Sequence, residues 1–234
     1  MPVLEIQKQL RRRGNKKKAK ILQRFFKTGL GEYGHGDRFL GVTVPVIRKI
    51  AEQHKDIPLP CSIRLLKSTI HEERVLALCI LVVQYKKSDT IKRKRIYELY
   101  LENTRWINNW DLVDLTAPHI VGAYLFNKDT RVLMRLAKSR MLWERRIAIV
   151  STFYFIRHNS FNETLTIAAL LLYDKEDLIH KAVGWMLREV GKRDVDCEEQ
   201  FLREYYKKMP RTMLRYAIER FPERKRQAYL KGNV

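Results

Sequence analysis

The chain has 234 residues, and 45% of them are hydrophobic, which is enough to bury a continuous core and excludes a disordered protein. Its 47 Lys and Arg against 26 Asp and Glu give a net charge of +21, so a polyanion, nucleic acid first, is the expected partner. The sequence has no apolar run of about 20 residues and no apolar signal core in its first ten residues, which predicts a cytoplasmic protein that does not enter a membrane.

Two basic helices are expected first, at 4–13 and 16–27, separated by Gly14 and Asn15. The densest charge run of the chain lies across this break, and it fits either an anion-binding face or an ordinary solvated helix face. The glycine-rich stretch 29–41 resembles a phosphate loop only superficially, because no predicted strand precedes it and no Gly-Lys-Ser/Thr follows. It predicts a loop that wraps over the first helices.

The remainder reads as a series of helices separated by short polar breaks, beginning at Thr43 and Pro45, which suit a helix cap and first turn. Further helices are expected at 61–67, 72–86, 89–102, 110–116, 119–127, 130–138, 142–157, 161–172, 176–191, 195–206, 211–221 and 223–231. Paired, they give about six units of about 40 residues, the period of HEAT or armadillo solenoids. The predicted fold is all-α, a single domain over 1–234; an irregular helical bundle is the alternative.

A short helix with an aromatic and an acidic side chain is expected where the sequence reads NNWDLVD, at 108–114. Asn109 is a good N-cap, and Pro118 ends the segment. Trp110 and Asp114 are four residues apart, so on a helix they lie on the same face, one turn apart. An indole face and a carboxylate that point the same way suit a cationic ligand, although such a pair also occurs in cores for structure alone.

A charged residue interrupts the apolar stripe of the helix expected at 142–157. The stripe is formed by Leu142, Ile149, Phe153 and Ile156. Arg146 lies within it and needs a counter-charge or a polar ligand, because a buried unpaired charge is costly. Asp114 is a natural partner, and the pair fits a structural role as well as a functional one. Arg145 is expected to be freer to reach solvent or phosphate.

Two downstream segments are candidates for DNA contact. At 180–193 a second indole, Trp185, is followed by Arg188, and Gly184 within the expected helix predicts a close approach of backbone or ligand. At 207–215 several cations surround a helix start, where free amides and positive charge together favour phosphate. These cations are Lys207, Arg211 and Arg215. A solvated basic turn is the alternative.

With these motifs in view, the chain resembles the AlkD-like family of bacterial DNA alkylation repair glycosylases, which are built from HEAT-like helical repeats. The resemblance rests on ordered motifs spread over most of the chain: GEYG at 31–34, GDRFLGV at 36–42, NNWDLVD at 108–114, WERRIA at 143–148 and AVGWMLRE at 182–189. It implies a right-handed solenoid of about six HEAT-like repeats with a concave basic groove.

The resemblance also implies roles for individual residues. Trp110, Asp114 and Trp185 would line the cleft beside the damaged nucleotide, and Arg146 would contact the DNA backbone there; because Arg145 adjoins Arg146, the family role falls on one or the other. The chemistry needs no metal and no organic cofactor, and the family holds the damaged nucleotide without a tight base pocket. The other predicted DNA contacts are Arg188, Lys207, Arg211 and Arg215.

The function expected from these features is a monofunctional DNA glycosylase of base excision repair. It would hydrolyse the N-glycosidic bond of cationic N3- or N7-alkylated purines in duplex DNA, acting as a monomer without an obligate protein partner. A purine alkylated at these positions is already a good leaving group, and Asp114 would stabilise the sugar cation. The alternatives are a non-catalytic HEAT-repeat DNA-binding scaffold and an adaptor for an acidic protein. The sequence HEER at 71–74 lacks the second histidine of a zinc protease helix.

Overall fold

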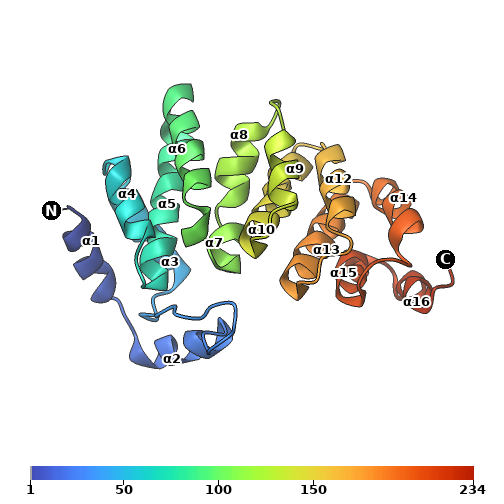
Figure 1. The fold of residues 1–234 in the computed structure, drawn as a ribbon, viewed down its shortest axis with the longest axis horizontal. Coiled ribbons are helices and arrows are strands. Elements are labelled where there is room, and N and C mark those ends of the chain that lie inside the picture. The colour runs from blue at the N-terminus through green and yellow to red at the C-terminus, as the bar shows by residue number, and fades with distance from the viewer. Residues whose placement is uncertain (1) are drawn as a thin grey trace. The chain divides into compact units, whose positions relative to one another are not determined.

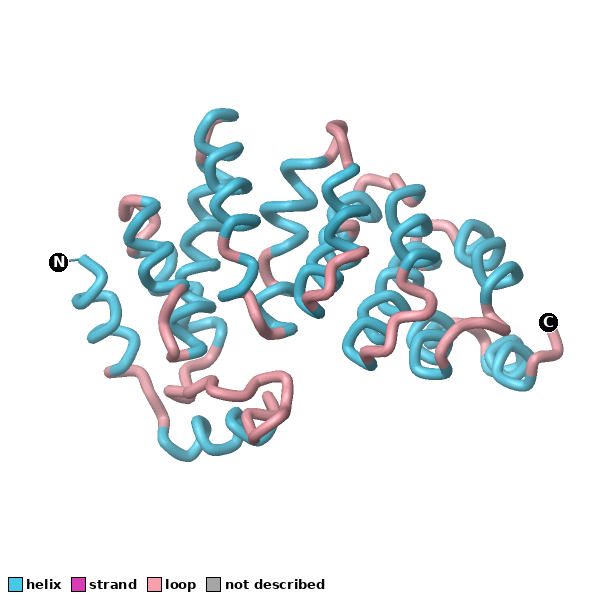
Figure 2. Tube along the Cα trace, in the orientation of Figure 1, coloured by secondary structure: helices cyan, strands magenta, loops and turns pink. Residues whose placement is uncertain are grey.

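The computed structural model describes residues 2–234, and over this range the chain is all-helical, as predicted (Figures 1 and 2). Arg38 and Ile70 form an isolated bridge, and no strand is present within 2–234. Among the helices of these residues, none is long and apolar enough to cross a membrane. The chain divides into two compact units, one ending at Thr116 and the other beginning at Ala117.

The first unit is built around one long buried helix. Its elements are α1 (Pro2–Arg11), α2 (Lys16–Phe25), α3 (Val44–Gln53), α4 (Leu59–Leu66), α5 (His71–Lys87), α6 (Thr90–Glu102), the 3-10 turn η1 (Thr104–Trp106) and α7 (Trp110–Asp114). Helix α5 packs against α3, α4, α6 and α7, and most of its residues are buried. Glu73 of α5 accepts hydrogen bonds from Gln7 and Arg11 and so attaches α1.

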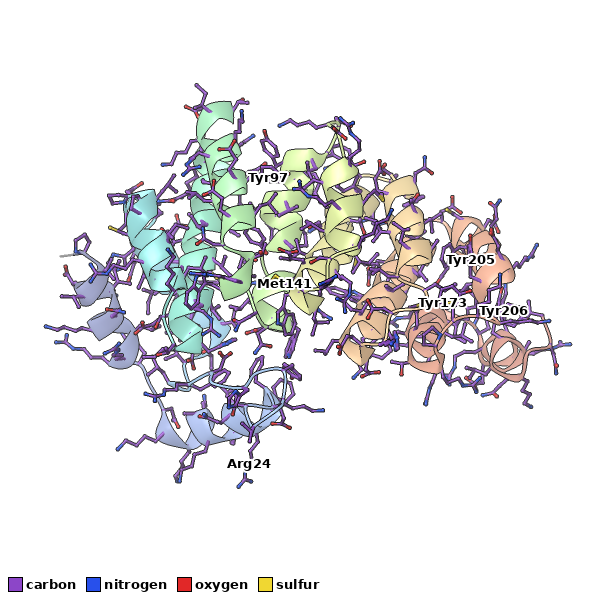
Figure 3. All side chains as sticks on the ribbon, in the orientation of Figure 1. Arg24, Tyr97, Met141, Tyr173, Tyr205 and Tyr206 are labelled. Carbon is purple, nitrogen blue, oxygen red and sulfur yellow. The ribbon has the colours of Figure 1, made fainter. Side chains whose placement is uncertain are left out.

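Helix α2 differs from its neighbours because none of its residues is fully buried. Ile21 and Phe25 on its apolar side remain 65% and 61% exposed. Its basic residues are all exposed, and Arg24 points outward from α2 in Figure 3. Helix α2 is therefore a basic amphipathic helix whose apolar side lies on a pocket rather than in a packed core.

The loop 26–43 fixes α2 to the rest of the first unit. Asn15 donates its backbone N–H to the carbonyl of Leu40 (2.8 Å), and the Gln23 amide donates to the carbonyl of Asp37 (3.1 Å). Gly41 has φ +81°, and a Cβ there would lie 2.2 Å from the carbonyl oxygen of Asn15, so this position requires glycine. The glycine-rich stretch is thus a loop over the first helices, as predicted.

The second unit is centred on α13. Its elements are η2, a π-helical turn (Pro118–Gly122), α8 (Ala123–Leu125), α9 (Arg131–Ala137), α10 (Leu142–Ser151), α11 (Phe153–Arg157), α12 (Asn162–Leu170), α13 (Asp177–Gly191), α14 (Val195–Tyr205), α15 (Arg211–Ala217), the 3-10 turn η3 (Ile218–Arg220) and α16 (Glu223–Lys231). Helix α13 packs against α10, α14 and α15, and α10 packs against α9. Packing of each helix on others near it in sequence is typical of helical repeats.

Two predicted helices of the second unit are divided. The helix predicted at 142–157 breaks at Thr152, whose hydroxyl donates to the carbonyl of Ile149 (2.7 Å) and ends α10 there. The helix predicted at 119–127 is a π-helical turn followed by α8, because Pro118 has no backbone N–H to continue a regular ladder. The other predicted helices match the structure to within two or three residues at their ends, apart from a final 3-10 turn at η3.

Gly184 is explained by helix packing. A Cβ at this position would lie 2.4 Å from the carbonyl oxygen of Met213 and 2.5 Å from Cβ of Tyr216, both on α15. The predicted close approach is therefore that of another backbone, and the glycine gives no support to a ligand site.

Gly184→Ala is expected to lower the free energy of unfolding by about 1–3 kcal/mol, because the backbone of α15 must move to admit the methyl group. In a helix without this contact the same change would stabilise by up to about 1 kcal/mol. Urea unfolding monitored by circular dichroism distinguishes the two, and a more stable variant would contradict the packing described for α13 and α15.

Candidate active site and nucleic-acid interface

Helix α7 presents Trp110 and Asp114 on one face, as predicted. Asn109 caps the helix, its side-chain oxygen accepting the N–H of Trp110 (2.8 Å). Both Trp110 and Asp114 are partly exposed, and both line the same pocket of the first unit. The indole and the carboxylate therefore face a common space that a ligand can enter.

This pocket, called here the α2–α7 pocket, has a volume of about 460 Å³. Its walls are mainly apolar. The lining residues are Lys18, Ile21, Leu22, Phe25, Phe26, Phe39, Gly41, Val42, Thr43, Val44, Ile47, His71, Glu72, Val75, Trp110, Asp111, Asp114 and Leu115. A mostly apolar pocket with a few convergent polar groups is the usual form of a ligand site.

An aromatic stack fixes the indole of Trp110 on the pocket wall. Phe26 stacks on Trp110 with ring centroids 5.0 Å apart and planes 13° apart, and it also stacks on Phe39 at 5.0 Å. Phe39 in turn stacks on His71 at 4.5 Å. Phe25 meets Trp110 edge to face at 5.9 Å. One face of the indole is thus held by the protein.

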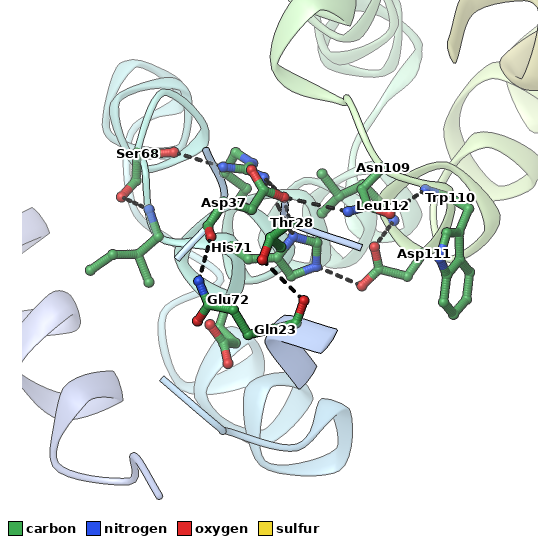
Figure 4. A network of polar contacts seen from close by, with 12 residues as sticks. Gln23, Thr28, Asp37, Ser68, His71, Glu72, Asn109, Trp110, Asp111 and Leu112 are labelled. Carbon is green, nitrogen blue, oxygen red and sulfur yellow. Dashed lines mark hydrogen bonds and ion pairs between the residues drawn. The ribbon is translucent and has the colours of Figure 1, made fainter. Parts of the chain in front are cut away.

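A buried polar network lies behind this stack. Figure 4 shows His71 between two carboxylates: its Nδ1 is 3.1 Å from Asp37 and its Nε2 is 2.7 Å from Asp111. Arg74 pairs with the same Asp37 at 2.7 Å, and the Asn109 amide donates to it at 3.4 Å. The network thus connects the loop 26–43, α5 and the start of α7.

The two carboxylates determine the charge of His71. Burial by itself lowers the pKa of the imidazole, but hydrogen bonds to Asp111 and Asp37 outweigh it, and the pKa is raised above its usual value. For Asp37 burial acts in the opposite direction and raises the pKa of the carboxyl. The hydrogen bond from His71 and the charge of Arg74 lower this pKa by more, so the net change is a decrease. An imidazolium between two carboxylates satisfies both ring nitrogens as donors.

Glu72, the next residue of α5, holds the loop 26–43 at the edge of the α2–α7 pocket. Its carboxylate accepts backbone N–H groups of Leu40 (2.9 Å), Gly41 (2.7 Å) and Val42 (3.3 Å). Glu72 is 2% exposed. Three amides directed at one buried carboxylate form a charge-assisted clamp.

Sequence reasoning did not find Asp37, His71, Glu72 or Asp111 as a cluster. Asp37, His71 and Asp111 are 34 and 40 positions apart along the chain. The available signal was the acidic start of the helix beginning at His71, but charged residues at a helix start are ordinarily solvated. Within residues 2–234 no group of His, Cys, Asp and Glu is arranged to hold a metal ion.

Trp185 belongs to the second unit, on α13. It is partly exposed, packs against Phe153 with ring centroids 5.7 Å apart, and donates its indole N–H to Glu189 (3.2 Å). Arg188 is only 17% exposed and pairs with Glu219 of η3. The guanidinium of Arg188, a predicted DNA contact, is thus already paired with a carboxylate of the protein.

The structure corrects the expectation for Arg145. Its guanidinium pairs with Asp174 (2.6 Å) and donates to the carbonyls of Ser139 and Arg140, so Arg145 is not freer to reach phosphate. Arg146 is 5% exposed, as its place on the apolar stripe predicts, and donates to the carbonyl of Leu178 (2.5 Å). Spacing along α10 places Arg145 off the stripe, but it gives no information about Asp174, a partner 29 residues away.

The cations predicted at 207–215 are exposed: Lys207 precedes α15, Arg211 is its first residue and Arg215 lies in its last turn. Lys207 lies over the ring of Tyr206 at 5.7 Å, and Arg211 donates to the carbonyl of Leu230 (2.5 Å). Helix α15 has no acidic residue of its own in its first turn, but Thr212 in that turn is hydrogen-bonded to the carboxylate of Asp177 on α13, which places a negative charge beside the helix start.

The family model described as DNA alkylation repair enzyme matches residues 6–221. A predicted DNA alkylation repair enzyme from Enterococcus faecalis superposes with a TM-score of 0.69 at 15% identity, covering 90% of this chain and 98% of that one. AlkD2 from Streptococcus mutans superposes with a TM-score of 0.59 at 17% identity, covering 89% and 99%.

No curated protein matches the chain by sequence. The two structural likenesses lie at low identity and show that the fold is shared. The family match extends over nearly all of the chain, including the helices that carry Trp110, Asp114 and Trp185. The chain therefore belongs to the DNA alkylation repair enzyme family.

Proposed function

We propose that this protein is a monofunctional DNA glycosylase that releases cationic N3- or N7-alkylated purines from duplex DNA. The observation that carries the proposal is the placement of Trp110 and Asp114 on one wall of the α2–α7 pocket in a member of the DNA alkylation repair enzyme family. The net charge of +21 favours DNA as the partner. An indole and a carboxylate together suit a cationic substrate.

In the proposed reaction the bond between C1′ and the purine nitrogen breaks, and its electron pair leaves with the base and neutralises its positive charge. Positive charge then develops on the sugar, as in glycoside hydrolysis. The carboxylate of Asp114 stabilises that charge and orients the water whose oxygen attacks C1′, while the proton of the water passes to solvent. Trp110 contacts the sugar or lesion with the part of its indole that is exposed in the pocket.

The pocket has few groups for reading a particular base. His71, Glu72 and Asp111 line it, but their polar atoms are hydrogen-bonded within the protein. Selection would then follow from the lability of a cationic base rather than from hydrogen bonds to its edge. This supports the expectation that the damaged nucleotide is held without a tight base pocket.

The proposal is tested with duplex DNA treated with a methylating agent. We expect the protein to release 7-methylguanine and 3-methyladenine, detected by chromatography of the free bases, and to leave abasic sites without strand cleavage. Unchanged release relative to buffer, together with retained DNA affinity, would reject the glycosylase and favour the alternative of a DNA-binding scaffold.

Lys207→Ala is expected to weaken DNA binding at every sequence and to reduce the slope of log K against log salt by about one unit, as loss of one phosphate contact should. Lys138→Ala removes the same charge from an exposed site at the end of α9 and is the matched control. Fluorescence anisotropy at several salt concentrations measures both slopes. Equal slopes for the two variants would place the phosphate contact elsewhere.

The proposed roles of Trp185, Arg145, Arg146, Arg188, Arg211 and Arg215 in the reaction or in DNA binding stay predictions. Trp185→Phe tests the most specific of them, because it keeps the packing on Phe153 and removes the indole N–H that Glu189 accepts. An unchanged rate of base release in this variant would restrict the reaction to the residues of α7.

A further inference from the structure

His71 is a buried histidine with a carboxylate partner at each of its two ring nitrogens. It is 2% exposed, and it lines the α2–α7 pocket together with Trp110 and Asp111. The charged groups that interact with its ring, among the residues the structure describes, are Asp37 of the loop 26–43, Arg74 of its own helix and Asp111 of α7. Phe26 and Phe39 pack against the ring.

The contact with α7 is the shortest of these. His71 Nε2 lies 2.7 Å from the carboxylate of Asp111. The other oxygen of this carboxylate accepts the backbone N–H of Leu112, the next residue (2.9 Å). Asp111 is the second residue of a helix only five residues long. Such a helix has little stability of its own, so its position depends on contacts like this one.

The opposite side of the ring connects the same imidazole to the loop. Nδ1 lies 3.1 Å from Asp37, and Asp37 also receives the Asn109 amide, whose carbonyl caps α7 at Trp110. Phe39 of the same loop stacks on His71, while Phe26 stacks on Trp110. Asp37 and Phe26 of the loop both contact the start of α7, at Asn109 and Trp110, and both also contact His71.

We propose that His71 is a positioning residue for the reaction: by joining Asp37 of the loop to Asp111 of α7, its imidazolium fixes Trp110 and Asp114 on the wall of the pocket. The inference rests on the proposed glycosylase function, which it deepens. Because its ring is 2% exposed and both ring nitrogens are bonded to carboxylates of the protein, His71 acts on the reaction through Asp37 and Asp111. This role explains why a charged histidine is buried in α5, which the role of the Asp114 carboxylate by itself does not explain.

The charge of the ring has a consequence for pH dependence. The pKa of His71 is raised from its ordinary value by the hydrogen bonds to Asp111 and Asp37, so the imidazolium is present below the ordinary imidazole pKa and is lost as pH rises through the raised value. When the proton leaves, one ring nitrogen has a lone pair in place of its N–H, so the carboxylate that faces it loses its donor, while the other carboxylate keeps its N–H donor. The start of α7 then loosens, and the rate of base release is expected to fall on the alkaline side.

His71→Gln tests the inference, with His35→Gln, an exposed histidine of the same loop, as the matched control. We expect His71→Gln to lower the single-turnover rate constant by about 10- to 100-fold, because Asp114 is misplaced, and to abolish the alkaline decrease of that rate constant. The Kd for DNA should stay within about twofold, because sites that are far apart contribute independently. His35→Gln should match the wild type in all three.

Asp111→Asn is the second variant, because it removes a charge and keeps the size of the side chain. It should lower the pKa of His71 and so move the alkaline decrease of the rate constant to lower pH. The titration of the His71 ring proton by NMR in the wild type gives the same pKa without reference to activity, and it applies even where His71→Gln does not fold.

The outcomes separate the inference from the proposed function. Absence of base release by the wild type rejects the proposed function itself. An active wild type whose rate, Kd and pH profile are unchanged by His71→Gln overturns the role of His71 alone. A His71 ring that titrates below its usual pKa, or an alkaline decrease that Asp111→Asn leaves in place, overturns it as well.

Discussion

Asp114→Asn is expected to lower the single-turnover rate constant for base release by about 100- to 1,000-fold, the usual effect of removing one group that stabilises transition-state charge. The amide keeps the size of the side chain on the wall of the α2–α7 pocket and removes its negative charge. DNA affinity should be retained or slightly increased, since a negative charge near the phosphates is lost. Quenched-flow or manual sampling with excess protein measures the rate constant, and anisotropy measures the affinity.

Asp56→Asn is the matched control, because Asp56 is an exposed carboxylate of the same unit that does not line the pocket. It makes the same chemical change and the same change in net charge. We expect it to leave the rate constant unaltered. Equal rates for Asp114→Asn and the wild type would remove the carboxylate from the mechanism.

Glu72→Ala is expected to lower the free energy of unfolding by about 3–5 kcal/mol, as breaking a buried charged interaction does. The substitution leaves the N–H groups of Leu40, Gly41 and Val42 without their acceptor, and unpaired buried donors are costly. Because the loop 26–43 carries Phe26 and Phe39, the aromatic stack behind Trp110 should loosen together with it.

Glu72→Gln is expected to have an intermediate effect on stability. Its one carbonyl oxygen can still accept the N–H groups of Gly41 and Val42, while its amide nitrogen faces the backbone nitrogen of Leu40. It should lose less stability than Glu72→Ala. Glu98→Ala, at a partly exposed glutamate of α6, is the control and should change stability little. Urea unfolding of the three variants measures the order. Glu72→Ala with wild-type stability would show that the clamp on the loop does not support the fold.

Sequence reasoning located the helices well because helix signals are local. Asp89, Asn109 and Asp194 each cap a helix by accepting a backbone N–H within three residues. It missed the break at Thr152, whose hydroxyl donates to the carbonyl of Ile149 in the preceding turn. The apolar periodicity continues past Thr152 to Phe153 and Ile156, so it gives no sign of this bond.

The pairing of Trp110 with Asp114 on one face was predictable, since four-residue spacing on a helix is a geometric rule. The support beneath them was not predictable, because Asp37, His71 and Asp111 come from three segments that only the tertiary fold brings together. Arg145 shows the same limit: its position on α10 was inferred correctly, but its partner Asp174 lies beyond any local pattern.

Single-turnover release of 7-methylguanine from methylated duplex DNA, compared between the wild-type protein and Asp114→Asn at equal DNA occupancy, tests the central claim most directly. The mechanism predicts rapid appearance of free base with the wild type and a rate at least about 100-fold lower with the variant. Free base appearing at the same rate in both, or at the spontaneous rate in both while the DNA stays bound, would contradict it.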